Sequence, residues 1–144
     1  MKKNMFWIII LALLLTACGT GSSENVAQTT SLTIGDKSYS VDDLKALPQT
    51  KSTFNDVDYV GVVLSDLLAD AGVEVDGLKA VKVIASDGYS MNYEPAIFTR
   101  ADVILSYAQA DGPLTEEDGL FRMVLPGEEG KLNVRQVAEI QAVQ

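Results

Sequence analysis

The stretch Tyr59-Val60-Gly61-Val62-Val63-Leu64-Ser65-Asp66-Leu67-Leu68, followed by Ala71-Gly72-Val73, decides the fold of this chain. Its first half has the aromatic and β-branched residues that are typical of a strand. Further along, apolar residues recur at helical spacing, and Gly72 follows the last of them as a helix C-terminal signal. We therefore predict a strand at 58–60 and a helix at 64–71.

The segments on either side of this stretch predict mostly strands. Ser40, with Asp43 three residues later, predicts a capping box that opens a short helix, and Pro48 ends it. Asp87-Gly88 predicts the turn of a hairpin. We expect strands at 32–34, 38–39, 50–54, 79–84, 89–93, 103–107, 121–125 and 134–143, and a helical turn or two within 94–99. The fold class predicted is α+β, a β-dominated mixed-sheet domain with two or three short helices.

Four further segments form an ordered series with the stretch quoted first. They are Ser86-Asp87-Gly88-Tyr89, the region from Ala101 to Leu114 with Ser106-Tyr107 and Asp111-Gly112, Gly119-Leu120-Phe121-Arg122-Met123-Val124-Leu125-Pro126-Gly127, and Val134 to Ile140. In this order the five segments resemble the molybdopterin-dependent oxidoreductase domains of the sulfite-oxidase-like fold. The resemblance spans about residues 32–143 and implies a sulfite-oxidase-like molybdopterin-binding fold.

The chain departs from that family where the cofactor chemistry resides. In the catalytic members a cysteine thiolate ligates molybdenum, and in some members a histidine helps to hold the pterin phosphate. This chain has no histidine, and its single cysteine is Cys18. Phe121 also stands where the family has a proline beside the arginine. The resemblance therefore implies the fold more than the chemistry. We expect no cofactor, although the resemblance leaves binding of molybdopterin open. The sequence does not decide whether the chain is an enzyme.

The N-terminal region has the features of a lipoprotein leader. Lys2 and Lys3 precede an apolar run from Met5 to Leu15, and Leu15-Thr16-Ala17-Cys18 follows. This pattern resembles the lipobox of bacterial lipoproteins, which implies cleavage before Cys18 and diacylation of its sulfur. The alternative is an ordinary signal peptide or a transmembrane anchor. We divide the chain into a lipoprotein signal peptide at 1–17, a lipidated cysteine and flexible tether at 18–30, and one folded domain at 31–144.

Composition limits the partners and the location. The formal charge is −9, and removal of the leader would make it more negative by taking away Lys2 and Lys3. This charge argues against nucleic acid as a partner and against electrostatic docking on anionic headgroups. We therefore expect attachment to the cell membrane through the N-terminal lipid, on the extracytoplasmic face. The expected partners are a small anionic or pterin-like ligand or an envelope redox protein.

Basic residues near the end of the domain are the first candidates for ligand binding. Arg122 lies in a predicted strand beside a turn, where a guanidinium suits a phosphate or a carboxylate. The alternative for Arg122 is an ion pair with a nearby acid. Arg135 and Lys131 could complete an anion site, as the resemblance implies, and the alternative for both is a solvated surface position. Arg100 has the same ambiguity without a motif.

The predicted turn Asp87-Gly88-Tyr89 combines a carboxylate, a flexible backbone and a phenol. A turn needs the first two residues without any ligand, so this alternative stays open. Tyr89 and Tyr93 share a face of their strand, and packing on the core is favoured over lining a pocket. For Glu116-Glu117-Asp118 a solvated loop is favoured over a calcium site. We expect no catalytic residue and no metal site.

Three functions remain open at this point. The favoured one is a membrane-anchored binding or accessory module that has lost molybdenum ligation, because the fold motifs are nearly complete while the thiol is absent. The second is an oxidoreductase that keeps molybdopterin without a protein thiolate. The third is a structural envelope lipoprotein.

Overall fold

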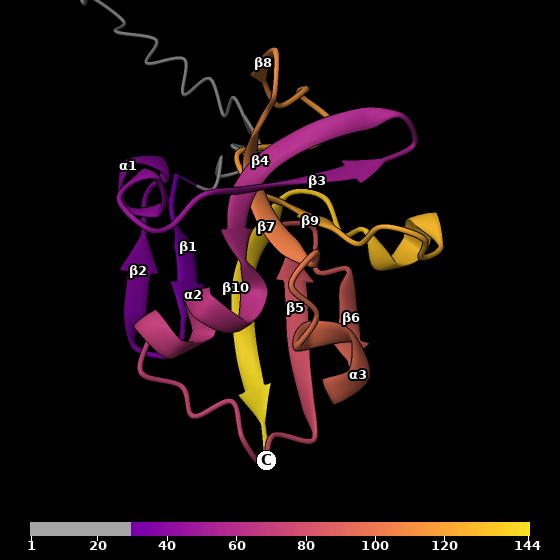
Figure 1. The fold of residues 1–144 in the computed structure, drawn as a ribbon. Coiled ribbons are helices and arrows are strands. Elements are labelled where there is room, and N and C mark those ends of the chain that lie inside the picture. Colours follow the sequence, from indigo (N-terminus) through magenta and orange to yellow (C-terminus); the bar gives the residue numbers. More distant parts are fainter. Residues whose placement is uncertain (1–29) are drawn as a thin grey trace, which may run out of the picture.

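The computed structural model describes residues 30–144. The predicted signal peptide, the lipidation site and nearly all of the predicted tether lie outside the described residues. Strands dominate, with three short helices among them (Figure 1). In chain order the elements are β1 (Leu32–Ile34), β2 (Lys37–Tyr39), α1 (Val41–Lys45), β3 (Thr50–Phe54), β4 (Val57–Val63), α2 (Leu64–Asp70), β5 (Ala80–Ala85), β6 (Ser90–Tyr93), α3 (Pro95–Phe98), β7 (Ile104–Gln109), β8 (Gly112–Pro113), β9 (Arg122–Val124), a 3₁₀ turn η1 (Gly130–Leu132) and β10 (Val137–Val143).

The strands form two five-stranded sheets. The first has the order β2-β1-β10-β5-β6, and the second has the order β3-β4-β7-β8, with β9 paired to β7. In the first sheet β1 and β10 run parallel, with Thr33 opposite Glu139, whereas every other strand pair is antiparallel. Figure 1 shows the first hairpin beside the long final strand. The two ends of the domain are thus joined within one sheet, which makes the domain one unit.

The core lies where the two sheets and the helices meet. One cluster of fully buried side chains contains Ile34 and Val83 from the first sheet together with Leu105 and Met123 from the second. The apolar face of α2 adds Leu64, Leu67 and Leu68, which are all fully buried. Burial of this apolar surface is the main term that stabilises a domain without a disulfide.

The predicted fold class is confirmed, and so are most local signals. Ser40 caps α1 through its side chain and Asp43 returns the contact, so the capping box is present. Gly72 follows α2 with φ +81°, a left-handed conformation that glycine adopts without strain. The final strand differs from its prediction because it begins at Val137 and not at residue 134. Gln136 has φ +50°, which is outside the strand region and prevents earlier pairing. The short strand β8 and the turn η1 were not predicted.

Gly61 marks a close approach between two strands of the second sheet. The pairing of β4 with β7 shifts register between Val60 and Gly61. A Cβ atom at Gly61 would lie 2.1 Å from the carbonyl oxygen of Leu105. Only glycine therefore allows the backbones to meet at this irregularity.

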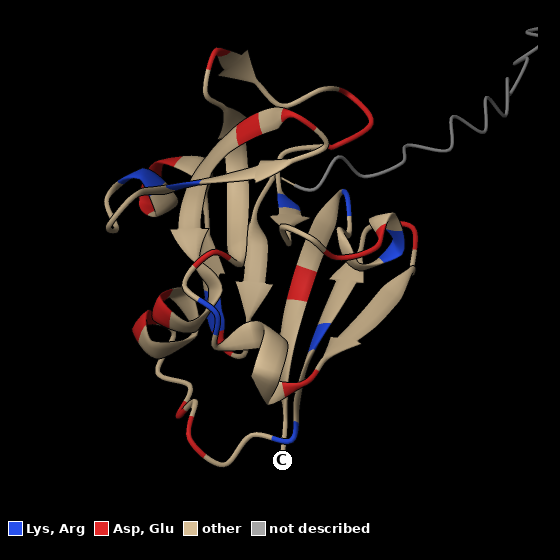
Figure 2. Cartoon of the chain, turned by 45° about the vertical axis from the view of Figure 1, so that its right-hand side comes forward, with Lys and Arg blue, Asp and Glu red and all other residues tan. Residues whose placement is uncertain are grey.

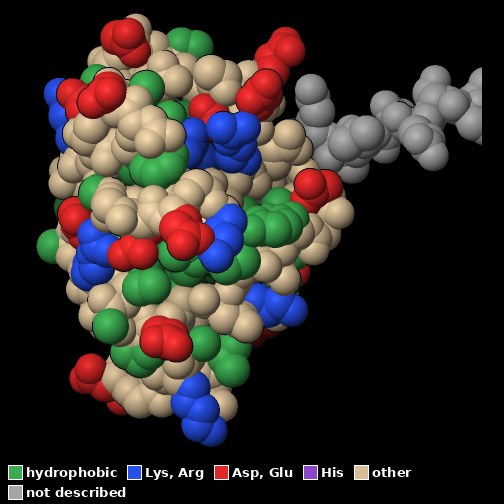
Figure 3. Space-filling model, turned by 90° about the vertical axis from the view of Figure 1, so that its right-hand side faces the viewer, with side chains coloured by type: hydrophobic (Ala, Val, Ile, Leu, Met, Phe, Trp, Pro, Cys, Tyr) green, Lys and Arg blue, Asp and Glu red, His purple; other side chains and the backbone are tan. Residues whose placement is uncertain are grey.

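Charged side chains are dispersed over the described part of the molecule. Acidic residues lie on α1, on α2 and on many of the loops (Figure 2). On the face shown in Figure 3, several basic side chains touch acidic ones, and they form no continuous basic patch there. Among residues 30–144, no helix is long and apolar enough to cross a membrane.

Candidate functional site

A pocket of about 380 Å³ lies where four segments distant in the sequence meet. They are the turn between β3 and β4, the turn between β5 and β6, strand β9, and the segment 130–135. Of the six residues predicted to bind a ligand, five line this pocket: Asp87, Tyr89, Arg122, Lys131 and Arg135. Gly88 is not in the lining, but its φ of +89° shapes the turn between Asp87 and Tyr89. The remaining lining residues, which sequence reasoning missed, are Phe54, Asn55, Ala85, Gly130, Asn133 and Val134.

Arg122 forms the buried part of the pocket wall. Its side chain is 3% exposed, and its Nη1 atom lies 2.7 Å from Oδ1 of Asp118. The same nitrogen donates a hydrogen bond of 2.9 Å to the hydroxyl of Tyr59, and the guanidinium lies 4.5 Å from the centre of the Tyr59 ring. The ion-pair alternative is therefore what the structure shows at Arg122, and a role in binding stays a prediction.

Asp118 corrects one expectation from the sequence. The acidic run was expected to be a solvated loop, and Glu116 and Glu117 are indeed exposed, but Asp118 is 3% exposed. Besides Arg122, its Oδ1 faces Nε of Arg135 at 3.4 Å. Among residues 30–144, no group of three or more acidic residues, histidines or cysteines could hold a metal ion. The expectation of a solvated loop therefore agrees with the exposure of Glu116 and Glu117 and is wrong for Asp118.

Arg135 and Lys131 lie at the open side of the pocket. Arg135 is 53% exposed and pairs with the carboxylate of Glu117 at 2.9 Å. Lys131 is 63% exposed and pairs with Glu129 at 2.6 Å, and this hydrogen bond raises the pKa of the lysine. Both side chains are therefore solvated and also placed to contact a ligand.

The turn between β5 and β6 places a carboxylate and a phenol in the wall. Oδ1 of Asp87 accepts a hydrogen bond of 2.9 Å from the backbone N–H of Tyr89, as in an Asx-turn. The Tyr89 ring is 45% exposed, and its hydroxyl donates to the carbonyl of Lys131 at 2.9 Å. Tyr93 is fully buried, and burial raises the pKa of its phenol. The preference for core packing is thus confirmed for Tyr93 and wrong for Tyr89, which lies in the turn just before β6 begins.

The segment that carries Lys131 and Arg135 is fixed by buried and bridging polar groups. The Asn133 side chain accepts a hydrogen bond of 2.7 Å from the Leu125 N–H and donates one of 3.2 Å to the Glu129 carbonyl. Asn133 is 3% exposed, so loss of either hydrogen bond would leave a buried polar group unpaired and would lower the stability of the domain. Arg100 donates to Glu128 at 2.7 Å and to the carbonyl of Pro126 at 2.8 Å. Arg100 is therefore a structural bridge to this segment.

Gln136, whose backbone has a φ of +50°, connects two segments beside the pocket. Its N–H donates to the Asp118 carbonyl at 2.8 Å, and its carbonyl accepts from the Ser86 N–H at 2.9 Å. A Cβ atom on Gly119 would lie 3.0 Å from Gln136 Cγ, so the backbone of Gly119 and the side chain of Gln136 are closely packed. The left-handed residue thus holds Arg135 next to Asp118 and beside the turn that carries Asp87.

The comparison with protein families decides the assignment. Residues 35–144 match the model of the oxidoreductase molybdopterin binding domain. The chain belongs to this family. It is 30% identical over 106 residues to mitochondrial sulfite oxidase of Drosophila melanogaster, covering 67% of this chain and 18% of that protein. The fold is similar to the crystal structure of the sulfane dehydrogenase SoxCD from Paracoccus pantotrophus, with a TM-score of 0.69 and 22% identity over 81% of this chain and 38% of that one. The chain thus spans well under half of either relative.

The pocket does not suit a metal centre held by protein sulfur. Its lining offers nitrogen and oxygen atoms alone, and residues 30–144 contain no cysteine and no histidine. Each of the three basic side chains in the lining also faces a carboxylate already. The residues of the pocket therefore do not fit thiolate-ligated molybdenum, although they offer polar contacts for a small organic molecule.

Proposed function

We propose that this protein is a membrane-anchored lipoprotein on the extracytoplasmic face that acts as a binding or accessory module. It uses the scaffold of the molybdopterin-binding domain to hold a small polar ligand, without molybdenum bound through the protein. The ligand lies in the pocket between the β5–β6 turn and the segment 130–135, with an anionic group at Arg135 and Lys131. The observation that carries this proposal is the pocket itself, which gathers five candidate residues and contains no sulfur.

The binding role is supported by the way the pocket is built. Hydrogen bonds of Asn133 with the Leu125 N–H and of Arg100 with the Pro126 carbonyl fix the segment 126–135, which favours a pocket that is formed before the ligand binds. A pocket of about 380 Å³ is of the size that small-molecule sites usually have. Its polar groups come from several segments and converge on one space, which is typical of a specific ligand site.

The loss of molybdenum ligation is tested by metal analysis. The full chain is produced in a bacterium that makes molybdopterin, together with a sulfite oxidase domain as a positive control. We expect molybdenum in the control. In this protein we expect far less than one equivalent of molybdenum and no pterin fluorescence after oxidation. Molybdenum and pterin at one equivalent would refute the proposal and favour an oxidoreductase that holds the metal through the cofactor alone.

The anchor is tested at Cys18. In a bacterial host, we expect the full chain to sediment with membranes and to incorporate labelled palmitate. The Cys18→Ser variant lacks the thiol that accepts the lipid, so label and membrane association should both be lost. Membrane association that persists unchanged in Cys18→Ser would exclude the lipid anchor and favour a transmembrane segment.

A further inference from the structure

We infer that the pocket takes a zwitterion, a small molecule with a cationic amine at Asp87 and a carboxylate at Arg135, whose apolar body lies against the ring of Tyr89. This inference rests on the proposed function, because it names the ligand class of the same pocket.

The charges of the lining support a cationic group on the ligand. Four charged side chains line the pocket: Asp87, Arg122, Lys131 and Arg135. Each of the three cations has a carboxylate within 2.9 Å. Asp87, by contrast, forms no ion pair with any residue that the structure describes, and its recorded contact is the backbone N–H of Tyr89. Asp87 is exposed and is the charged side chain of the lining that has no ion-pair partner among the described residues, so it is available to pair with an ammonium group of a ligand.

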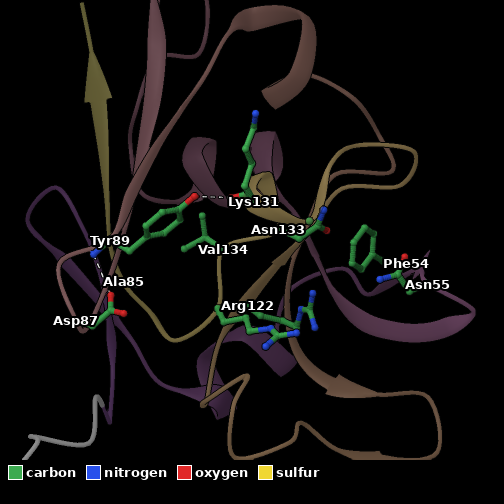
Figure 4. Close-up of a pocket in the computed structure, with 11 residues that line it drawn as sticks. Phe54, Asn55, Ala85, Asp87, Tyr89, Arg122, Lys131, Asn133 and Val134 are labelled. Atoms are coloured by element: carbon green, nitrogen blue, oxygen red, sulfur yellow. Dashed lines mark hydrogen bonds between the residues drawn. The ribbon is translucent and has the colours of Figure 1, made fainter.

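Tyr89 extends the site from this carboxylate toward the basic side. Its backbone N–H contacts Asp87 and its hydroxyl contacts the Lys131 carbonyl, so the ring is held at both ends. Figure 4 shows this ring along one side of the pocket and Phe54 on the other. An exposed aromatic face attracts an ammonium group and packs against an apolar body. The ring thus offers an apolar surface in the wall beside Asp87, against which the body of a ligand can pack.

Arg135 is the cation best placed to accept the carboxylate, because its chain neighbour Gln136 is hydrogen-bonded to the neighbour of Asp87. Its partner Glu117 is 80% exposed, and exposed ion pairs contribute little, so a ligand carboxylate can replace Glu117 at small cost while Nε keeps its contact with Asp118 at 3.4 Å. Arg122 is less suited, because it is 3% exposed and already bound to Asp118.

Asp87 and Arg135 also lie close enough to be bridged by one small molecule. Ser86 and Gln136 are hydrogen-bonded to each other through the Ser86 N–H at 2.9 Å, and Asp87 and Arg135 are their direct neighbours in the chain. A ligand with only a negative group would bring that charge near Asp87 without a counter-charge. The pair of opposite charges therefore favours a zwitterion over a simple anion.

The test uses three probes that share one ring: 4-(aminomethyl)benzoate, benzylamine and 4-methylbenzoate. Binding to the full chain in detergent is measured by ligand-observed NMR and calorimetry. We expect 4-(aminomethyl)benzoate to bind about two- to fivefold more tightly than either other probe, the size of one exposed charge pair. Asp87→Asn keeps the oxygen that accepts the Tyr89 N–H and removes the charge, so the advantage over 4-methylbenzoate should disappear. Arg135→Gln should remove the advantage over benzylamine.

The matched control is Asp111→Asn, which removes a carboxylate from an exposed Asp-Gly turn outside the pocket and should leave all three affinities unchanged. Equal binding of 4-methylbenzoate and 4-(aminomethyl)benzoate, with no effect of Asp87→Asn, would overturn the zwitterion while leaving the proposed binding module intact as an anion site. Failure of all three probes to bind at millimolar concentration would also overturn it. The proposed function fails separately, if the metal analysis finds molybdenum.

Discussion

Removing the positive charge of Arg122 should cost this domain a large part of its stability. The side chains of Arg122 and Asp118 are 3% and 4% exposed, and their charged atoms are 2.7 Å apart. Arg122→Met leaves the carboxylate buried with only the more distant Arg135 guanidinium, at 3.4 Å, as its counter-charge. Breaking a buried pair by removing one partner typically costs about 3–5 kcal/mol. Domains of this size are stable by about 5–15 kcal/mol, so the variant should unfold far more easily.

The measurement is urea unfolding of the full chain, followed by far-ultraviolet circular dichroism. Arg122→Met, Asp118→Asn and the double variant form a thermodynamic cycle. We expect the double variant to lose at least about 1 kcal/mol less than the sum of the single variants, because the second change no longer strands a buried charge. Lys45→Met is the control, since it removes an exposed pair with Asp42 and should change stability by at most about 0.5 kcal/mol.

Two results would refute this reasoning. A loss below about 1 kcal/mol for Arg122→Met would mean that the pair behaves like an exposed one. Strict additivity in the cycle would mean that Arg122 and Asp118 are not coupled, and that the stacking of Arg122 on the Tyr59 ring carries the stability.

Two further predictions concern the strands and the segment around the pocket. Gly61→Ala should lower the free energy of unfolding in urea by about 3 kcal/mol or more, because the new Cβ would lie 2.1 Å from the Leu105 carbonyl oxygen. The control Gly112→Ala has open space around the new Cβ and should change the stability little, and equal effects of the two variants would contradict the close approach. Arg100 hydrogen-bonds to the Asp102 carboxyl and holds its pKa below the ordinary 3.8, so its stabilisation is present above that pH and is lost as the pH falls. The stability difference between the wild type and Arg100→Gln should therefore narrow below pH 3.8, and a difference that stays constant on acidification would exclude this linkage.

Local signals in the sequence predicted local structure well, since short-range contacts decide them. The side chain of Ser40 and that of Asp43 three residues later are enough to start α1, and both contacts are present. The Asp87-Gly88 pair specifies its turn in the same way, through the Asx contact to Tyr89 and the φ of +89° at Gly88. The strands and the fold class followed from such pieces together with the order of the motifs.

The site was predicted only in part, because it depends on contacts between distant segments. Asp118 looks like its exposed neighbours Glu116 and Glu117 in the sequence, and it is buried only because Arg122 from β9 faces it. Phe54 enters the pocket because its hairpin passes over β9, which no feature of residues 50–54 indicates. By contrast, the basic residues were identified from residue type and from the resemblance, which require no knowledge of packing.

We expect the distribution of charge in the lining, more than the shape of the pocket, to select the ligand. A pterin cofactor with a phosphate and a dithiolene brings several negative charges into a space where Asp87 is already uncompensated. To receive that charge, Lys131 and Arg135 would have to give up Glu129 and Glu117, while the buried Arg122 would have to leave Asp118. The first two exchanges cost little because those pairs are exposed, but the third would take the nearest counter-charge away from the buried carboxylate of Asp118. A ligand of balanced charge would leave the pair of Arg122 and Asp118 intact, and this supports the proposal of a binding module over that of a molybdenum enzyme.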